Sequence, residues 1–204
     1  MAFNLSLDRA LTLSKDFWDE EYEAAAKFSA VMSSWGELAG VPVGGLTGGL
    51  GQAIGFIDVT RVVPKAVDCW NGLTPQALGS FLETAAKALK WVLGNLTQWD
   101  TTGLRLTGNV AAVFHNGAKA VQDLSFLANT GNQVGDGYDS GRDMAQALGV
   151  VKRTATVVMN SYGLATALAG VAIPAPVALA TATLGLVAHT ASFAIKHEVR
   201  ALQP

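Results

Sequence analysis

The sequence predicts an all-α protein, and three observations lead to this prediction. Apolar residues recur at three- and four-residue spacing along most of the 204 residues, whereas the two-residue alternation of half-buried strands is hard to find. Helix start signals occur, such as Thr74 followed by Pro75, a capping residue before a first-turn proline. No charged residue lies between Thr154 and Ile195. We therefore expect one domain, a helical bundle of about five to six helices with a hydrophobic C-terminal helical hairpin.

The first expected helix is amphipathic and covers residues 14–35. Ser14 can cap it, and acidic residues follow in its first turn, where the positive end of the helix dipole favours them. The helix is expected to end at Gly36. Its apolar stripe consists of Phe17, Trp18, Tyr22, Ala25, Phe28, Met32 and Trp35.

Two further amphipathic helices are expected in the middle of the chain, over residues 75–99 and 104–128. Lys87 and Lys90 lie on the polar side of the first one. The second is expected to end in a polar, glycine-rich loop over residues 129–143. The apolar faces are Leu78, Phe81, Leu82, Ala85, Leu89, Val92, Leu93 and Leu96 in the first helix, and Leu106, Val110, Val113, Phe114, Gly117, Val121, Leu124 and Leu127 in the second.

The stretch VPVGGLTGGLGQAIGFI, residues 41–57, combines six glycines with no charged residue. We interpret residues 38–57 as a helix that packs closely against lipid, a neighbouring helix or another copy, because glycine lets helix backbones approach each other. In water each glycine costs a helix ~1 kcal/mol relative to alanine, so an irregular glycine-rich loop is the alternative. The predicted packing positions are Gly40, Gly44, Gly48, Gly51 and Gly55.

Gly45, Gly49 and Gly51 in this stretch resemble the glycine-rich turn of the short-chain dehydrogenase/reductase family, whose pattern is Thr-Gly-x-x-x-Gly-x-Gly. The resemblance implies a nucleotide-binding turn between a strand and a helix. The sequence has Gly44 where the family has threonine, and the preceding Val-Pro-Val segment contains a proline, which disfavours a central strand. The family's Tyr-x-x-x-Lys pair is absent, so a nucleotide binder is a remote alternative.

The uncharged run contains two segments, residues 154–173 and 177–195, separated by an Ile-Pro-Ala-Pro turn. Each segment is close to the ~20 residues that cross a hydrocarbon core of ~30 Å as a helix. Basic residues lie on both outer flanks, which would place them on the cytoplasmic face of a bilayer. Alanine, threonine and glycine dominate both segments, so a hairpin buried in protein is the alternative. The predicted membrane or helix-packing positions are Gly163, Ala167, Pro174, Pro176, Gly185 and the ionisable His189.

Composition indicates that part of the chain avoids water. Half of the residues are hydrophobic and 15% are charged, against about 25% charged residues in typical soluble domains, and the mean hydropathy is +0.31. The net charge is -2 and basic residues do not cluster in the sequence, so we expect no nucleic-acid partner. The N-terminal residues carry no apolar core of signal-peptide length, and we expect a membrane-associated protein inside a cell or within a virion.

The sequence contains no recognisable catalytic, cofactor-binding or metal-binding constellation. His115, His189 and His197 lie in separate segments, and the single Cys69 is interpreted as a buried hydrophobe. We therefore expect a non-enzymatic structural or assembly component, anchored by its hairpin, with lipid membrane and other protein subunits, including copies of itself, as partners. The alternative is a soluble bundle that inserts its hairpin into membranes, because an uncharged, alanine-rich hairpin resembles that of the pore-forming domain of colicins.

Overall fold

The computed structural model describes residues 22–96, 100–130 and 137–201, and these residues form six α-helices and no strand. The all-α prediction is therefore confirmed for the described part of the chain. Ser14 and the other first-turn residues expected to begin the first helix lie outside it. The helices are α2 (Tyr22–Ala39), α3 (Gly44–Asn71), α4 (Pro75–Leu96), α5 (Thr102–Thr130), α6 (Gly137–Ala169) and α7 (Ala175–Ala201).

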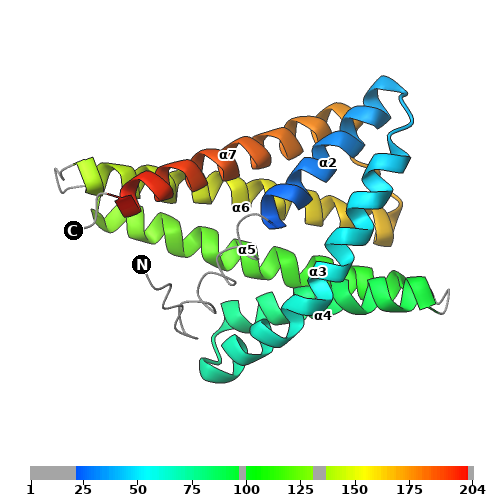
Figure 1. Cartoon of the computed structure of the whole chain (residues 1–204), viewed down its shortest axis with the longest axis horizontal. Helices are drawn as coiled ribbons and strands as arrows, with labels where there is room; N and C mark the ends of the chain where they lie inside the picture. The colour runs from blue at the N-terminus through cyan, green and yellow to red at the C-terminus, as the bar shows by residue number, and fades with distance from the viewer. Residues whose placement is uncertain (1–21, 97–99, 131–136, 202–204) are drawn as a thin grey trace, which may run out of the picture.

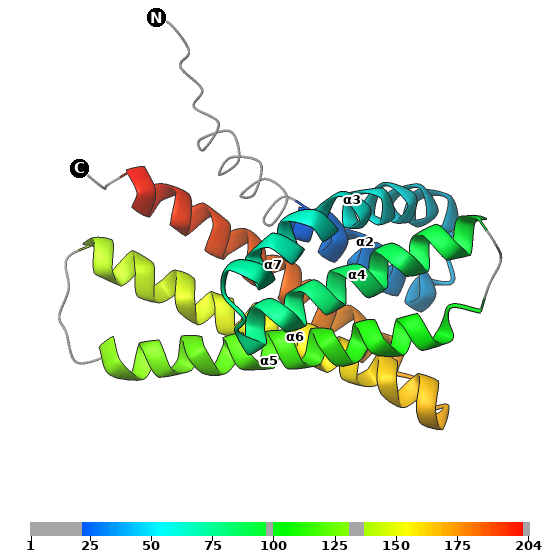
Figure 2. The same ribbon diagram turned by 90° about the horizontal axis from the view of Figure 1, so that it is seen from below.

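The helices form a closed ring. Each helix packs against its neighbours in the chain, and α7 returns to pack against α2. In Figure 1, α6 and α7 lie side by side, α5 runs beside α6, and α3 crosses from the end of α2 to α4. Figure 2 shows the same arrangement from below, with α5 and α6 extending beyond the shorter α4. The ring brings segments from both halves of the chain around one interior.

Local sequence explains several helix ends. α4 begins at Pro75, as predicted, and the Thr74 hydroxyl caps it by accepting a hydrogen bond from the Ala77 amide at 3.1 Å. α5 begins shortly after Asp100, whose carboxylate accepts a hydrogen bond from the Thr102 amide at 2.9 Å. α6 begins at Gly137, so part of the loop expected over residues 129–143 is helical.

The glycine-rich segment differs from the expected single helix over residues 38–57. The chain turns between α2 and α3 at Gly40, which has a φ of 65°, a left-handed conformation that favours glycine. The Val41 amide donates to the Gly36 carbonyl at 2.9 Å, which completes a glycine-type helix cap. α3 then starts at Gly44 and continues past Pro64 to Asn71. The glycine-rich stretch is thus a turn followed by a helix.

The C-terminal hairpin is present as two packed helices, but the structure does not show two apolar spans. α6 ends at Ala169, because Gly170, with a φ of 67°, terminates it before the expected boundary at residue 173. Its uncharged part, residues 154–169, would be about 24 Å long, less than a hydrocarbon core of ~30 Å. Within the described residues, Ala175–Lys196 of α7 is the one helical segment long and apolar enough to cross a membrane.

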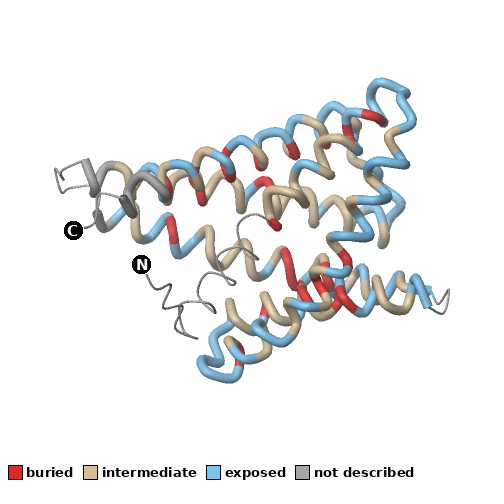
Figure 3. The backbone as a smooth tube through the Cα atoms, viewed as in Figure 1, coloured by how far each residue is buried: buried red, intermediate tan, exposed pale blue. Residues whose placement is uncertain are grey.

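The buried residues of the described chain are mostly small, and many large apolar side chains are exposed. Figure 3 shows that buried residues are few, whereas exposed residues occur on every helix. Apolar helix faces point to the core in water-soluble proteins, but here no residue of the predicted apolar faces of α4 and α5 is buried, and half of these residues are exposed. Among the described residues, no large side chain is almost completely buried. The buried apolar positions are mostly alanines, namely Ala86, Ala88, Ala111, Ala112, Ala145, Ala155, Ala178, Ala182 and Ala188. The exposed large apolar residues of α2, α4 and α5 include Phe28, Trp35, Leu38, Leu78, Leu82, Leu89, Leu96, Val110, Phe114, Val121 and Leu124.

Candidate functional site: a cationic cavity inside the helix ring

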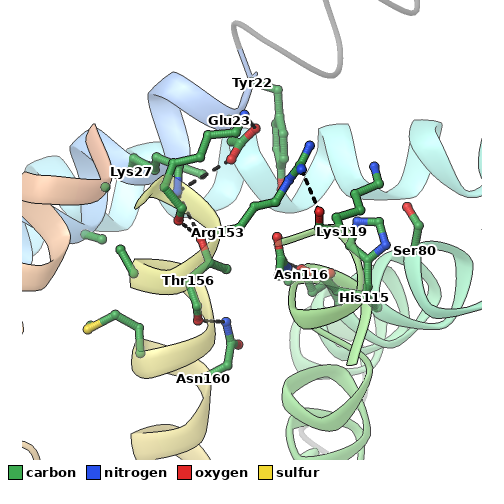
Figure 4. Close-up of a pocket in the computed structure, with 18 of the residues that line it drawn as sticks. Tyr22, Glu23, Lys27, Ser80, His115, Asn116, Lys119, Arg153, Thr156 and Asn160 are labelled. Carbon is green, nitrogen blue, oxygen red and sulfur yellow. Dashed lines mark hydrogen bonds and ion pairs between the residues drawn. The ribbon is translucent and has the colours of Figure 1, made fainter. Parts of the chain in front are cut away.

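A cavity of about 490 Å³ occupies the interior of the ring, and all six helices contribute side chains to it. Figure 4 shows side chains of α2, α4, α5 and α6 facing this space. Arg153, Thr156 and Asn160 project from α6, while His115, Asn116 and Lys119 project from α5. Polar and charged groups therefore gather at the centre of the molecule.

The charges around the cavity are unevenly distributed. Eight lining residues are lysine or arginine, against three carboxylates, Glu23, Asp58 and Glu83. The eight are more than half of the 14 basic residues of a chain whose net charge is -2. Two like charges about 8 Å apart repel by about 2 kcal/mol at an effective dielectric constant of about 20. The basic residues are Lys27, Arg61, Lys65, Lys87, Lys119, Lys152, Arg153 and Lys196.

Glu23 on α2 joins three helices. Its carboxylate lies 2.9 Å from the Lys152 Nζ of α6, 3.5 Å from the Lys27 Nζ and 3.5 Å from the His189 Nδ1 of α7. Burial disfavours the charged carboxylate, but the charges of Lys152, Lys27 and His189 outweigh that effect and lower the pKa of Glu23 to about 2. Glu23 is therefore a charged link that holds α2 against α6 and α7.

Asp58 on α3 also lines the cavity and is buried, with 3% of its surface exposed. It accepts a hydrogen bond from the Tyr22 hydroxyl at 2.7 Å, and Arg61 lies 3.8 Å away with its guanidinium over the Tyr22 ring. Burial raises the pKa of Asp58, although the Tyr22 hydrogen bond and nearby cations act against this. Burial and the charge of Asp58 also raise the pKa of Tyr22. This group attaches α2 to α3.

Further polar groups lie on the α5 side of the cavity. Arg153 of α6 pairs with Asp123 and donates to the Lys119 carbonyl at 3.2 Å. The His115 ring nitrogen Nδ1 lies 3.0 Å from the Gln76 carbonyl of α4. Burial and the charge of Lys119 lower the pKa of His115 to about 4, so this imidazole is neutral near pH 7.

The glycine positions predicted for close packing fall into two groups. Gly40 forms the turn before α3, and a side chain added at Gly44, Gly48 or Gly51 would meet no atom of the described chain. Gly55, in contrast, lies directly under the Trp91 ring of α4. The structure therefore shows a packing contact within the described chain for Gly55 and none for the first group.

The predicted hairpin positions lie at helix contacts, at the turn or at the cavity. Asn109 of α5 lies against Gly163, where an added Cβ would be 2.7 Å from its Nδ2. Gly185 lines the cavity, 3.4 Å from the Ala155 Cβ by the same measure. His189 is 3% exposed and lies 3.3 Å from the Lys152 Nζ in addition to its contact with Glu23. Ala167 is half-buried near the end of α6, and Pro174 and Pro176 are exposed around the start of α7.

The sequence interpretation singled out Gly185, which lines the cavity, and His189, which contacts the lining residue Glu23, but it missed the other lining residues. The lining residues are spread over positions 22–196, and basic residues that converge in space are not adjacent in the chain. The sequence did contain one signal of a polar site. The charged residues of an amphipathic helix lie together on one polar face, whichever way the apolar face points. Within the described residues, no three or more His, Cys, Asp or Glu side chains are grouped to hold a metal ion.

The basic residues and carboxylates around the cavity can bind and neutralise charged groups at the centre of the ring. The glycine-rich start of α3 does not follow a strand in the described chain, so the βαβ unit required by the nucleotide-binding alternative is not formed there. Comparisons with known proteins add no assignment: the chain matches no protein-family model, and no curated protein or solved structure is significantly similar to it.

Proposed function

We propose that this chain is a non-enzymatic, membrane-associated structural or assembly component. The observation that supports the proposal is the inside-out distribution of side chains: large apolar residues outside, alanines between helices and charges around an interior cavity. In a bilayer, lipid covers apolar side chains, small residues let helices approach closely, and ionisable residues turn to the interior. The exposed fraction is 60% for Phe56, 68% for Val63 and 90% for Trp70.

The proposed anchor is the C-terminal hairpin. α7 supplies one segment of membrane-spanning length, and Leu184 and Val187 on its exposed face are available to lipid. The uncharged part of α6, residues 154–169, would lie beside α7 in the bilayer but is shorter than the hydrocarbon core. Copies of the chain, or other subunits, are the proposed partners for apolar surface that lipid leaves uncovered.

Flotation with liposomes tests the proposal. The full chain, synthesised without cells in the presence of liposomes, should float with the vesicles in a density gradient and resist extraction by alkaline carbonate. The double variant Leu184→Glu/Val187→Glu should lose most of this association, because each carboxylate on the lipid-facing side of a helix costs about 2–3 kcal/mol of insertion free energy.

The matched control is Ser33→Glu/Thr107→Glu, which adds the same charge at two exposed polar positions of other helices. It should float like the unmodified chain. A wild-type chain that stays in the aqueous fraction and is monomeric in buffer without detergent would show that integral anchoring is wrong.

A second candidate function is that of a soluble bundle that inserts its hairpin into membranes as a pore-forming effector. The observation that favours it is the polar attachment of the hairpin to α2, through Glu23 to Lys152 and His189. Water can replace such contacts more easily than apolar packing. A detergent-free monomer that leaks dye from liposomes would support this candidate over the first.

A further inference from the structure

We propose that Lys27 forms an imine with the carbonyl group of a small aldehyde bound in the cavity. Such a site goes beyond membrane association and does not depend on it, because the amine and its neighbours belong to the interior of the helix ring. Three features carry the proposal: the position of the Lys27 amine, the charges around it and the space beside it.

The Lys27 amine lies where three helices meet. Its side chain is 14% exposed and reaches from α2 to α6, where the Nζ donates a hydrogen bond to the Thr156 hydroxyl at 3.1 Å (Figure 4). Thr156 donates its own proton to the Lys152 carbonyl at 2.9 Å, so its oxygen acts as an acceptor toward Lys27. On α7, a Cβ added at Gly185 would be 3.6 Å from the Nζ. The amine is therefore held at a defined place in the cavity that it lines.

Lys27 and Lys152 share the carboxylate of Glu23. The carboxylate lies 2.9 Å from the Lys152 Nζ and 3.5 Å from the Lys27 Nζ, so Lys152 has the closer pairing. Burial lowers the pKa of Lys27, and the charge of Lys152 adds to this effect, while Glu23 acts against it. The neutral amine is the form that attacks a carbonyl carbon, and a lysine desolvated beside another cation reaches this form more readily.

Lys87 has the opposite surroundings in the same cavity. Its Nζ lies 2.6 Å from the Glu83 carboxylate. Desolvation disfavours the Lys87 ammonium, but the charge and the hydrogen bond of Glu83 outweigh this effect and raise its pKa. Two lysines that line one cavity are therefore expected to differ in reactivity, with Lys27 the more nucleophilic.

The space beside the Lys27 amine suits a small organic molecule. The cavity has a volume of about 490 Å³, and pockets that hold small organic ligands have roughly 300–1,000 Å³. The same three helices contribute small or apolar lining residues, which can contact the hydrocarbon part of an aldehyde. These residues are Ala26, Ala30, Ala155, Met159, Ala182 and Gly185.

Imine formation at Lys27 needs no further reactant. The nitrogen forms a bond to the carbonyl carbon and passes two protons to the carbonyl oxygen, which leaves as water. Ammonium and aldehyde thus give a protonated imine and water, so no electrons are gained or lost and the single positive charge stays on the nitrogen. Glu23 remains beside it as the counter-ion, and the remaining N–H can still donate to Thr156.

The test traps the imine on the full chain in detergent. Hexanal and sodium cyanoborohydride convert an imine into a stable secondary amine, and mass spectrometry of peptides locates the added hexyl group. Lys27 should carry most of the first equivalent of label, ahead of the cavity residue Lys87 and the exposed Lys90 of α4. Oxidised dextran, whose aldehydes are attached to a polymer too large for the cavity, should label Lys90 and leave Lys27 unmodified.

Three variants connect the labelling to the geometry. Lys27→Arg keeps the positive charge but cannot form the imine, so the early hexyl label should be lost. Lys152→Gln should slow labelling of Lys27 several-fold, because Glu23 then pairs with Lys27 and the cation that lowers its pKa is gone. Lys90→Gln, the matched loss of an exposed lysine, should leave the labelling of Lys27 unchanged.

Labelling of Lys27 by oxidised dextran identifies any variant in which the fold has opened, and circular dichroism measures its helix content. Hexanal labelling of Lys90 or Lys87 at least as fast as that of Lys27 in the wild-type chain would overturn the proposal. An undiminished early label in Lys27→Arg would do the same. Neither result bears on flotation with liposomes, so the membrane proposal fails or stands separately.

Discussion

Glu23 contacts Lys27, Lys152 and His189, and its ionisation gives the protein a defined pH dependence. Its pKa of about 2 lies below the ordinary value of 4.5, so its pairing stabilises the fold above pH 4.5, and this contribution is lost as the pH falls from there to about 2. The shift corresponds to about 3 kcal/mol for a fully buried group. The side chain is 32% exposed, and solvent reduces the contribution to roughly 1–2 kcal/mol.

Glu23→Gln should therefore lower the free energy of unfolding near neutral pH and flatten its fall between pH 4.5 and 2. Denaturant unfolding at several pH values measures both effects. Glu37→Gln, at an exposed position of the same helix, is the control for loss of one negative charge. An unchanged pH profile in Glu23→Gln would contradict the role given to this carboxylate.

Tyr22 offers a second test at the residue scale. Tyr22→Phe keeps the ring under Arg61 but removes the hydroxyl that donates to the buried Asp58. The unfolding free energy should fall by roughly 1–2 kcal/mol, because the carboxylate loses a hydrogen bond that water does not easily replace. Tyr162→Phe should have little effect, since the Tyr162 hydroxyl makes no hydrogen bond to the described part of the chain. Equal stability losses in both variants would count against a specific Tyr22–Asp58 link.

At the scale of elements, α3 contains glycines with opposite surroundings. Gly48 has open space around it, so Gly48→Ala should stabilise the chain in detergent by up to about 1 kcal/mol, the difference in helix propensity. Gly55→Ala should destabilise it by roughly 1–3 kcal/mol, because the new methyl group overlaps the Trp91 ring. Thermal unfolding of both variants checks the signs.

The same pair of variants bears on what covers the start of α3. If another copy packs on Gly48, Gly48→Ala should weaken association in sedimentation experiments while still raising the stability of the isolated chain. A stabilising effect of Gly55→Ala would mean that α3 and α4 are farther apart than the structure shows.

The sequence predicted the helices well, but it predicted poorly which of their faces are buried. Periodicity and the Thr74-Pro75 signal locate α4, because helix formation depends on neighbouring residues. Gly40 and Gly170 set helix ends that differ from the expected ones, since any glycine inside an apolar run can continue a helix or end it. Whether the apolar or the polar face of α4 points inward depends on what surrounds the bundle. The spacing of the apolar residues is the same in both orientations, so it does not distinguish them.

The candidate site was predictable only in part for the same reason. His189 is conspicuous because it is ionisable within an uncharged run. Its neighbours Glu23 and Lys152 come from α2 and α6, and only the closing contact between α2 and α7 brings them together. Contacts between residues so far apart in the chain leave no spacing pattern in a single sequence.

At the scale of the whole molecule, the outward apolar surface predicts a spectroscopic response to lipid. Trp70 is 90% exposed, whereas Trp91 is half-buried against α3. In a variant that keeps Trp70 and has phenylalanine at the other tryptophans, vesicles should shift the emission to shorter wavelength, and brominated lipids should quench it.

A matching variant that keeps only Trp91 should respond much less, because its indole donates to the Gln52 side chain at 2.8 Å and lies against Gly55. Equal quenching of both tryptophans would mean that lipid reaches the interior of the bundle. No response from Trp70 would place the end of α3 in water.

The contact between α2 and α7 also affects how the molecule is made. A ribosome synthesises α7 after the other five helices, so the ring stays open until the last of its walls has emerged. Until then Glu23 lacks its His189 contact, and the converging lysines face an open groove. The cavity is therefore completed only after α7 has been made, and a nascent chain arrested before Ala175 would leave the cavity open on the side that α7 lines.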